Sequence, residues 1–154
     1  MTPEQFHDLI VPITKAMAGR PVDRDLENWL NAQYGAKTAT PTQFDAACKA
    51  GIAAGWMCAQ GSEGRRFGRV IPPTPATQDF SVDVVQIRNA HGPHHSHPNG
   101  EILLILPQTP AARFDARGLG WKVYPPGSAH YPTVTGGEAI VLYLLPGGAI
   151  AFTK

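Results

Sequence analysis

The pattern of residues changes at Gly55, and this change constrains the fold more than any other feature of the chain. Beyond Gly55, short apolar or β-branched runs alternate with glycine, proline and asparagine, which interrupt strands and form turns. The candidate strands are residues 56–59, 66–71, 80–88, 101–106, 112–115, 120–124, 139–145 and 149–153. Many short strands with close turns predict an antiparallel sandwich or barrel.

The first third of the chain has the periodicity of helices instead. Within residues 3–18, apolar side chains recur on one helical face, at Phe6, Leu9, Ile10, Ile13 and Met17. A second amphipathic segment ends at Gly35, and a third is predicted to begin with Thr40 as its N-cap and Pro41 in its first turn. We therefore expect three short helices before the β-rich part.

Length and composition exclude several kinds of protein. A chain of 154 residues has the usual size of one domain, so we expect a single domain over 1–154, with helices in 1–54 and the barrel in 55–154. The balance of 13 basic and 12 acidic residues predicts no nucleic-acid partner. No apolar run approaches the roughly 20 residues of a membrane span, and we expect no membrane partner.

The expected compartment follows from the N-terminus and the cysteines. The first residues are polar and acidic and lack the pattern of a secretory signal. Cys48 and Cys58 have no C-x-x-C spacing and suit buried thiols in a reducing environment. We expect a cytoplasmic protein.

The segment H-G-P-H-H-S-H-P-N-G-E, residues 91–101, contains four of the six histidines. On an extended strand, the side chains of His95 and His97 leave the same face. Pro98 then ends the strand, and Asn99-Gly100 is a strong hairpin signal that places Glu101 at the start of the returning strand. Two imidazoles and one carboxylate form a facial set of ligands for a divalent metal.

A second motif, Y-P-P-G-S-A-H, follows some thirty residues later, and there we expect His130 to open the strand after the turn. The segments H-S-H-P-N-G-E and P-P-G-S-A-H resemble the H-x-H-x-x-x-E and P-x-G-x-x-H cores of the two cupin motifs. Val134 and Gln108 depart from the asparagine and glycine that many cupins have there, but neither change removes a ligand. The resemblance implies a mainly β, cupin-type antiparallel barrel (a double-stranded β-helix, or jelly roll) after the helical extension.

It also implies that His95, His97, Glu101 and His130 hold one divalent metal ion. Zinc, iron, manganese and nickel all suit these ligands, and the sequence does not choose between them. The alternative is a histidine-rich loop or a cupin barrel without a metal. His91 and His94 do not fit the ligand register, and we expect His94 on the opposite side of the strand.

Apolar strand residues are expected to line a substrate cavity beside the metal. Leu103 and Ile105 share the face of Glu101, and further candidates are Trp121, Val123, Leu142 and Leu144, although ordinary core positions are the alternative for all of these. Arginine matches a substrate carboxylate with two parallel hydrogen bonds. Arg69 and Arg88 lie within predicted strands and are preferred over Arg65 and Arg66.

The run from G-R-R-F-G-R-V-I-P-P-T-P through H-G-P-H-H-S-H-P-N-G-E-I-L-L-I-L-P, together with the helical extension, resembles the 4-hydroxylaminobenzoate lyase family. The resemblance implies conversion of 4-hydroxylaminobenzoate to 3,4-dihydroxybenzoate with release of ammonia, in the degradation of nitroaromatic acids. The metal would assist cleavage of the N–O bond, and an arginine would hold the carboxylate of this small aromatic substrate. Tyr124, His94 and Glu138 are the candidate proton donors.

Two other functions remain open at this point. One is an Fe(II)-dependent cupin oxygenase that acts on a small aromatic or thiol substrate, and the other is a cupin that binds a ligand without turnover. Strands that are apolar on both faces, such as residues 102–106, are consistent with a homodimer or with helices packed over the sheet.

Overall fold

A computed structural model describes residues 1–153. Three helices come first: α1 (Pro3–Met17), α2 (Arg24–Tyr34) and α3 (Thr40–Ala54). The side chains of Thr2 and Asp23 cap α1 and α2 by accepting hydrogen bonds from backbone N–H groups of the first turn. The predicted cap of α3 is wrong by one residue, because Ala39 is the N-cap and Thr40 is already helical.

The rest of the described chain consists mainly of short strands, with one 3-10 helix, η1 (Pro75–Thr77). The strands are β1 (Gln60–Ser62), β2 (Arg65–Ile71), β3 (Phe80–Arg88), β4 (His95–His97), β5 (Glu101–Pro107), β6 (Arg113–Phe114), β7 (Gly120–Tyr124), β8 (Ser128–His130), β9 (Val134–Thr135), β10 (Glu138–Pro146) and β11 (Ala151–Phe152). None of the helices within residues 1–153 combines the length and the hydrophobicity of a membrane-spanning segment.

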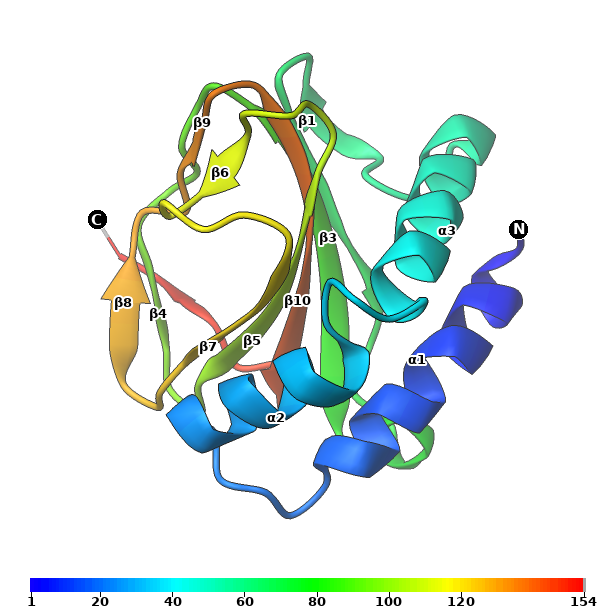
Figure 1. The fold of residues 1–154 in the computed structure, drawn as a ribbon, viewed down its shortest axis with the longest axis vertical. Coiled ribbons are helices and arrows are strands. Elements are labelled where there is room, and N and C mark those ends of the chain that lie inside the picture. Colours follow the sequence, from blue (N-terminus) through cyan, green and yellow to red (C-terminus); the bar gives the residue numbers. More distant parts are fainter. Residues whose placement is uncertain (154) are drawn as a thin grey trace.

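The strands form antiparallel sheets that face each other. The larger sheet has the order β1-β2-β3-β10-β5-β7, the smaller one has the order β11-β4-β8, and β6 pairs with β9. The helices cover one face of the larger sheet, and β4, β8 and β11 lie beyond its other face (Figure 1). This architecture confirms the predicted mainly β, cupin-type fold with three N-terminal helices.

Strands β3, β5 and β10 of the larger sheet each contribute to two apolar cores. The outer face packs against the helices through Val82, Val84, Ile102, Leu104, Leu106, Trp121, Val123, Ile140, Leu142 and Leu144. The interior, between the sheets, contains Val85, Ile87, Leu103, Ile105, Phe114, Val134, Ala139, Val141, Tyr143 and Leu145. Residues 102–106 are therefore apolar on both faces because the three helices cover one face and the interior core lies on the other.

These two cores correct part of the predicted cavity lining. Leu103 and Ile105 lie in the interior, as the position of Glu101 indicates. The other four candidates, Trp121, Val123, Leu142 and Leu144, belong to the outer core instead. Alternation along a strand sends neighbouring residues to opposite faces, so a shift of one position exchanges interior for exterior.

Three local predictions are also wrong. Residues 56–59 are not a strand, because Met57 and Cys58 are buried in the core with the helices and β1 begins at Gln60. The Asn99-Gly100 turn does not close a hairpin, because β4 and β5 belong to different sheets. His130 ends β8 rather than opening a strand.

Candidate metal centre

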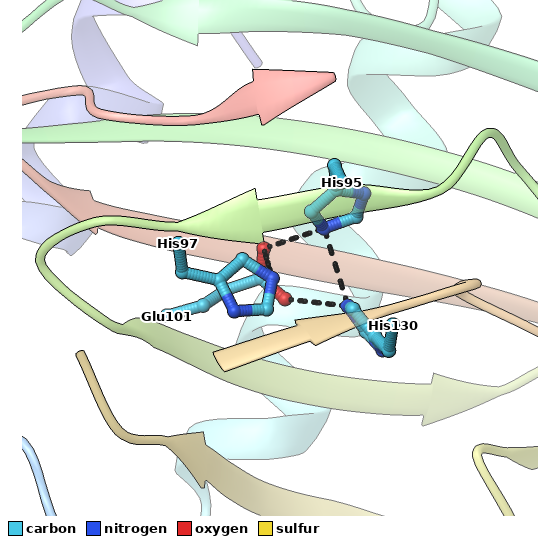
Figure 2. A group of neighbouring side chains, drawn as sticks. All are labelled: His95, His97, Glu101 and His130. Atoms are coloured by element: carbon cyan, nitrogen blue, oxygen red, sulfur yellow. Dashed lines mark hydrogen bonds and ion pairs between the residues drawn. The ribbon is translucent and has the colours of Figure 1, made fainter. Parts of the chain in front are cut away.

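Four side chains from three strands meet between the two sheets. His95 and His97 leave β4 on one side, Glu101 begins β5, and His130 ends β8 (Figure 2). One ligand atom from each of the four lies within 4.8 Å of the others. Glu101 and the two β4 histidines are buried, and the His130 side chain is 11% exposed. The structure thus brings together the four residues that the two motifs single out.

The turn before Glu101 and the turn before His130 both form hydrogen bonds with the same backbone carbonyl group. The carbonyl of His97 accepts hydrogen bonds from the backbone N–H groups of Gly100 at 3.1 Å and Gly127 at 2.8 Å. Both glycines have a positive φ, and a Cβ at Gly100 would lie 2.9 Å from the Tyr124 carbonyl oxygen. This shared contact holds the turn before Glu101 against the turn before His130.

The Nε2 atoms of the three histidines point toward the Glu101 carboxylate. Oε2 of Glu101 lies 3.1 Å from His95 Nε2 and 3.0 Å from His97 Nε2, while Oε1 lies 3.3 Å from His130 Nε2. His95 Nε2 and His130 Nε2 are themselves 3.2 Å apart. All the potential ligand atoms therefore converge on one point.

The other nitrogen of each imidazole ring has a partner outside this point. Nδ1 of His95 lies 3.3 Å from the Pro93 carbonyl, and Nδ1 of His97 lies 2.9 Å from Ser128 Oγ. Nδ1 of His130 lies 2.6 Å from Asp115 Oδ2. Partners of this kind fix the ring orientation and the tautomer of metal-binding histidines.

This arrangement fits a divalent cation. When the Nδ1 atoms donate to their partners, the Nε2 atoms present lone pairs to one another and to the carboxylate. Among the described residues, His97 Nε2 and Glu101 Oε1 are buried side-chain atoms without a hydrogen-bond partner. Buried atoms of this kind are costly unless a ligand satisfies them, and a metal ion would satisfy all four donors at once.

Asp115 is one residue of the site that the sequence motifs did not reveal. It lies in a turn in which Phe114 and Arg117 exchange two backbone hydrogen bonds of 2.8 Å, and its φ is +47°. Its carboxylate accepts hydrogen bonds from His130, from the Tyr124 hydroxyl and from the backbone N–H of Thr133. The sequence gives little indication that Asp115 belongs to the site, because its partners come from distant segments.

The electrostatics of the cluster favour an ionised carboxylate. In the metal-free protein, burial raises the pKa of Glu101, but the neighbouring imidazoles of His130, His95 and His97 outweigh burial and hold this pKa far below its usual range. Burial also raises the pKa of Asp115, and its hydrogen bonds with His130 and Tyr124 bring the net shift downward. Two carboxylates thus remain charged on either side of the His130 ring.

A largely apolar cavity of about 270 Å³ adjoins the cluster. His95 and Tyr143 line it on one side, and Arg65, Arg69 and Asp83 line it on the side of β2 and β3. Apolar side chains between them include Phe67, Val85, Ile87, Pro93, Ile150 and Phe152. A flat aromatic molecule with polar ends suits such a cavity.

The two predicted carboxylate-binding arginines have different surroundings. Arg69 lines the cavity, where it pairs with Asp83 at 2.7 Å and also donates to the Gly148 carbonyl. Arg88 pairs with Glu138 at 3.1 Å, and neither of these two residues lines the cavity. Arg65, which the sequence ranked lower, lines the cavity, and within residues 1–153 its side chain has one polar contact, at 3.5 Å to the His91 carbonyl.

The predicted proton donors also separate in space. The Tyr124 ring lies beside His130, with ring centroids 4.5 Å apart, and its hydroxyl donates to Asp115. His94 lies outside the cluster, as expected from its register, and contacts Thr153 and Tyr131. Tyr143, a residue not predicted for the site, contacts the cavity directly.

Comparisons with known proteins agree on one family. A model of the 4-hydroxylaminobenzoate lyase family matches residues 8–152. A 4-hydroxylaminobenzoate lyase from Nocardioides sp. is 31% identical over 98% of this chain and 95% of its own length. A second, from Pseudomonas putida, is 29% identical over 97% and 94%.

Solved structures of cupin-type proteins give weaker matches. An RmlC-like cupin protein from Ralstonia eutropha aligns with 62% of this chain and 64% of its own, with 12% identity and a TM-score of 0.46. A cupin-like protein from Thermotoga maritima aligns with 64% and 86%, with 16% identity and a TM-score of 0.38.

Proposed function

The chain belongs to the 4-hydroxylaminobenzoate lyase family, and we propose that it converts 4-hydroxylaminobenzoate and water to 3,4-dihydroxybenzoate and ammonia. In this reaction the N–O bond breaks and the ring gains a hydroxyl group on the carbon beside the nitrogen-bearing carbon. Water then replaces the nitrogen on its own carbon, and the nitrogen leaves as ammonia. The change is redox-neutral, because the nitrogen is reduced as the ring is oxidised. Such a step belongs to the degradation of nitroaromatic acids.

The observation that carries the proposal is the position of the histidine–glutamate cluster beside an apolar cavity with arginines across it. Tyr143 on β10, Asp83 on β3 and the arginines on β2 lie on three successive strands. Two strand spacings of about 4.8 Å each separate the backbone of β10 at Tyr143 from that of β2 at Arg69 by about 10 Å. A benzene ring with polar groups at opposite positions is suited to this length.

The four residues of the cluster would hold a divalent metal ion. When bound, this ion would supply Lewis acidity for weakening the N–O bond. Asp115 holds the His130 ring in its orientation, and the Tyr124 hydroxyl fixes the Asp115 carboxylate in turn. Of the three proton donors suggested by the sequence, Tyr124 is the one that contacts the cluster.

The opposite end of the cavity would bind the substrate carboxylate. Arg65 and Arg69 supply positive charge there, and Asp83 neutralises part of it through its pair with Arg69. The apolar side chains between the ends contact the ring faces and exclude water from the reacting bond. The substrate would then lie lengthwise, with its hydroxylamino group at the cluster.

The test is to incubate purified, metal-loaded protein with 4-hydroxylaminobenzoate and to measure ammonia and 3,4-dihydroxybenzoate. We expect equal amounts of both products, at the same rate with and without oxygen. Glu101→Gln, which removes the charge of the cluster, is the matched inactive control. Oxygen consumption would indicate an oxygenase, and tight binding without product would indicate a ligand-binding protein; either result would contradict the proposal.

A further inference from the structure

Tyr143 has a buried hydroxyl group that nothing in the described chain satisfies. The residue is 4% exposed, and its hydroxyl oxygen is one of four buried side-chain N and O atoms without a hydrogen-bond partner. Two of the other three are His97 Nε2 and Glu101 Oε1, which face the proposed metal. The third, Ser81 Oγ, belongs to a residue that does not line the cavity.

The surroundings of Tyr143 place it between the cluster and the cavity. Its side chain lines the cavity, and its ring centroid lies 6.3 Å from that of His95 and 6.2 Å from that of Phe114. In the sheet it stands opposite Asp83 on β3 and Leu103 on β5. A molecule in the cavity that reaches His95 therefore passes the phenol ring.

The Tyr143 phenol is protonated and can donate a hydrogen bond. Burial raises the pKa of Tyr143 well above its usual value, and the nearby carboxylates of Glu101, Asp115 and Asp83 raise it further. The group is thus neutral at physiological pH and carries a hydrogen. A buried hydroxyl without a partner destabilises a fold, so its presence beside a cavity needs a reason outside the fold itself.

The other polar side chains near this end of the cavity have hydrogen-bond partners or face the proposed metal. Tyr124 donates its hydroxyl hydrogen to Asp115, and the three cluster histidines have partners at Nδ1. At the opposite end, Arg69 is paired with Asp83. Tyr143 is the hydroxyl group that can donate to a bound molecule without breaking an existing contact.

We propose that Tyr143 is a substrate-binding residue whose hydroxyl donates a hydrogen bond to the oxygen-bearing substituent opposite the carboxylate of an aromatic acid. This inference rests on the proposed function, since it names the group that contacts the hydroxylamino oxygen. It also predicts specificity, because an acid with an oxygen atom at this position binds better than one with hydrogen there.

The experiment compares two unreactive acids, 4-hydroxybenzoate and benzoate, which differ only in the group that Tyr143 would contact. Calorimetry gives the dissociation constant of each with metal-loaded wild type, Tyr143→Phe and Tyr34→Phe. The last variant removes a hydroxyl from α2, outside the cavity. In Tyr143→Phe, the preference for 4-hydroxybenzoate over benzoate is expected to fall roughly three- to tenfold, the value of one neutral hydrogen bond. Tyr34→Phe should keep the wild-type preference.

A stability measurement separates this role from a structural one. Because the hydroxyl has no partner within the protein, Tyr143→Phe should unfold at the same temperature as wild type or at a higher one. A lower unfolding temperature, an unchanged preference in Tyr143→Phe, or a wild type that binds neither acid would overturn the inference. The turnover assay tests the proposed function separately: a changed preference without ammonia release would refute the lyase reaction and leave the Tyr143 contact standing.

Discussion

Asp115 Oδ2 lies 2.6 Å from His130 Nδ1, on the side of the imidazole ring that faces away from Glu101. The contact makes His130 the centre of a chain that runs from the Tyr124 hydroxyl through Asp115 to the cluster. A carboxylate in this position increases the basicity of a metal-binding histidine and restricts its rotation. The pair therefore bears directly on how tightly the site would bind a metal.

Replacing Asp115 should weaken the metal site without destroying it. In Asp115→Asn the shape is kept and the negative charge is lost, so we expect divalent-metal affinity to fall about 10- to 100-fold. A competition titration with a chromogenic chelator measures this affinity. Asp79→Asn is the matched control, because Asp79 lies in the turn between η1 and β3 and contacts none of the four ligands. Equal affinities for both variants would show that Asp115 does not support the site.

Metal affinity should also depend on pH through His130. In the metal-free protein, burial lowers the pKa of His130, but Asp115 and Glu101 outweigh it and raise the pKa from 6.5 to about 9. The protonated ring therefore stabilises the metal-free fold below about pH 6.5, and this contribution is lost as the pH rises through about 9.

A metal ion must displace that proton. Affinity should therefore fall by up to about tenfold for each pH unit below the His130 pKa, and binding should release a proton. Calorimetric titration in two buffers with different ionisation enthalpies counts the protons released. Binding that releases no proton at neutral pH would contradict this assignment.

The two arginines that line the cavity should respond differently to substitution. Arg65 has one weak polar contact within the protein, so its main expected partner is the substrate carboxylate. Arg65→Gln should therefore raise KM for 4-hydroxylaminobenzoate about tenfold, the cost of a charge-assisted hydrogen bond at a partly exposed position. Arg69→Gln should also lower the unfolding temperature, because Asp83 loses its partner. Arg66→Gln is the control, since Arg66 follows Arg65 on β2 and does not line the cavity. A KM that is unchanged in Arg65→Gln would place the carboxylate elsewhere.

Glu27 connects the helical layer to the barrel and should control part of its acid stability. Its carboxylate accepts a hydrogen bond from the backbone N–H of Val123 at 2.9 Å and pairs with Arg117 and Lys122. Burial raises the pKa of Glu27, but these partners outweigh it and lower the pKa. Its stabilising effect is thus present above the ordinary glutamate value of about 4.3 and is lost as the pH falls through the lower, folded-state value.

Glu27→Ala leaves the Val123 N–H without its partner and should cost about 1–3 kcal/mol of unfolding free energy at neutral pH. Denaturant unfolding of both proteins over a range of pH measures the difference, which should shrink in acid. Asp25→Ala in the same helix turn, with no such contact to β7, is the control. A difference that persists unchanged at low pH would refute the ionic part of the argument.

The sequence was most informative where a polar residue fixes the orientation of a strand. Glu101 must face the histidines, and this sets Leu103 and Ile105 in the interior. No such marker exists in β10, which is apolar on both faces, so its two alternating sets of residues could not be distinguished. Tyr143 was missed for this reason, and Leu142 was placed on the wrong side.

Contacts between distant segments were also beyond the sequence. Asp115 meets His130 and Thr133 only after the chain has folded, and its own turn has no motif. The apolar residues near Met57 have the composition of a strand, but the helices bury them instead. Tertiary packing determines the conformation of such short segments, because their intrinsic secondary-structure preference is weak.

Metal analysis of purified protein shows whether His95, His97, Glu101 and His130 bind one metal ion. Wild type, His97→Ala and His91→Ala are each saturated with a divalent metal, dialysed and measured by mass spectrometry for metal per chain. We expect about one equivalent for wild type and for His91→Ala, whose histidine lies outside the cluster, and a large loss for His97→Ala. A wild type without stoichiometric metal, or a His97→Ala variant that retains it, would show that these four residues do not form a metal site.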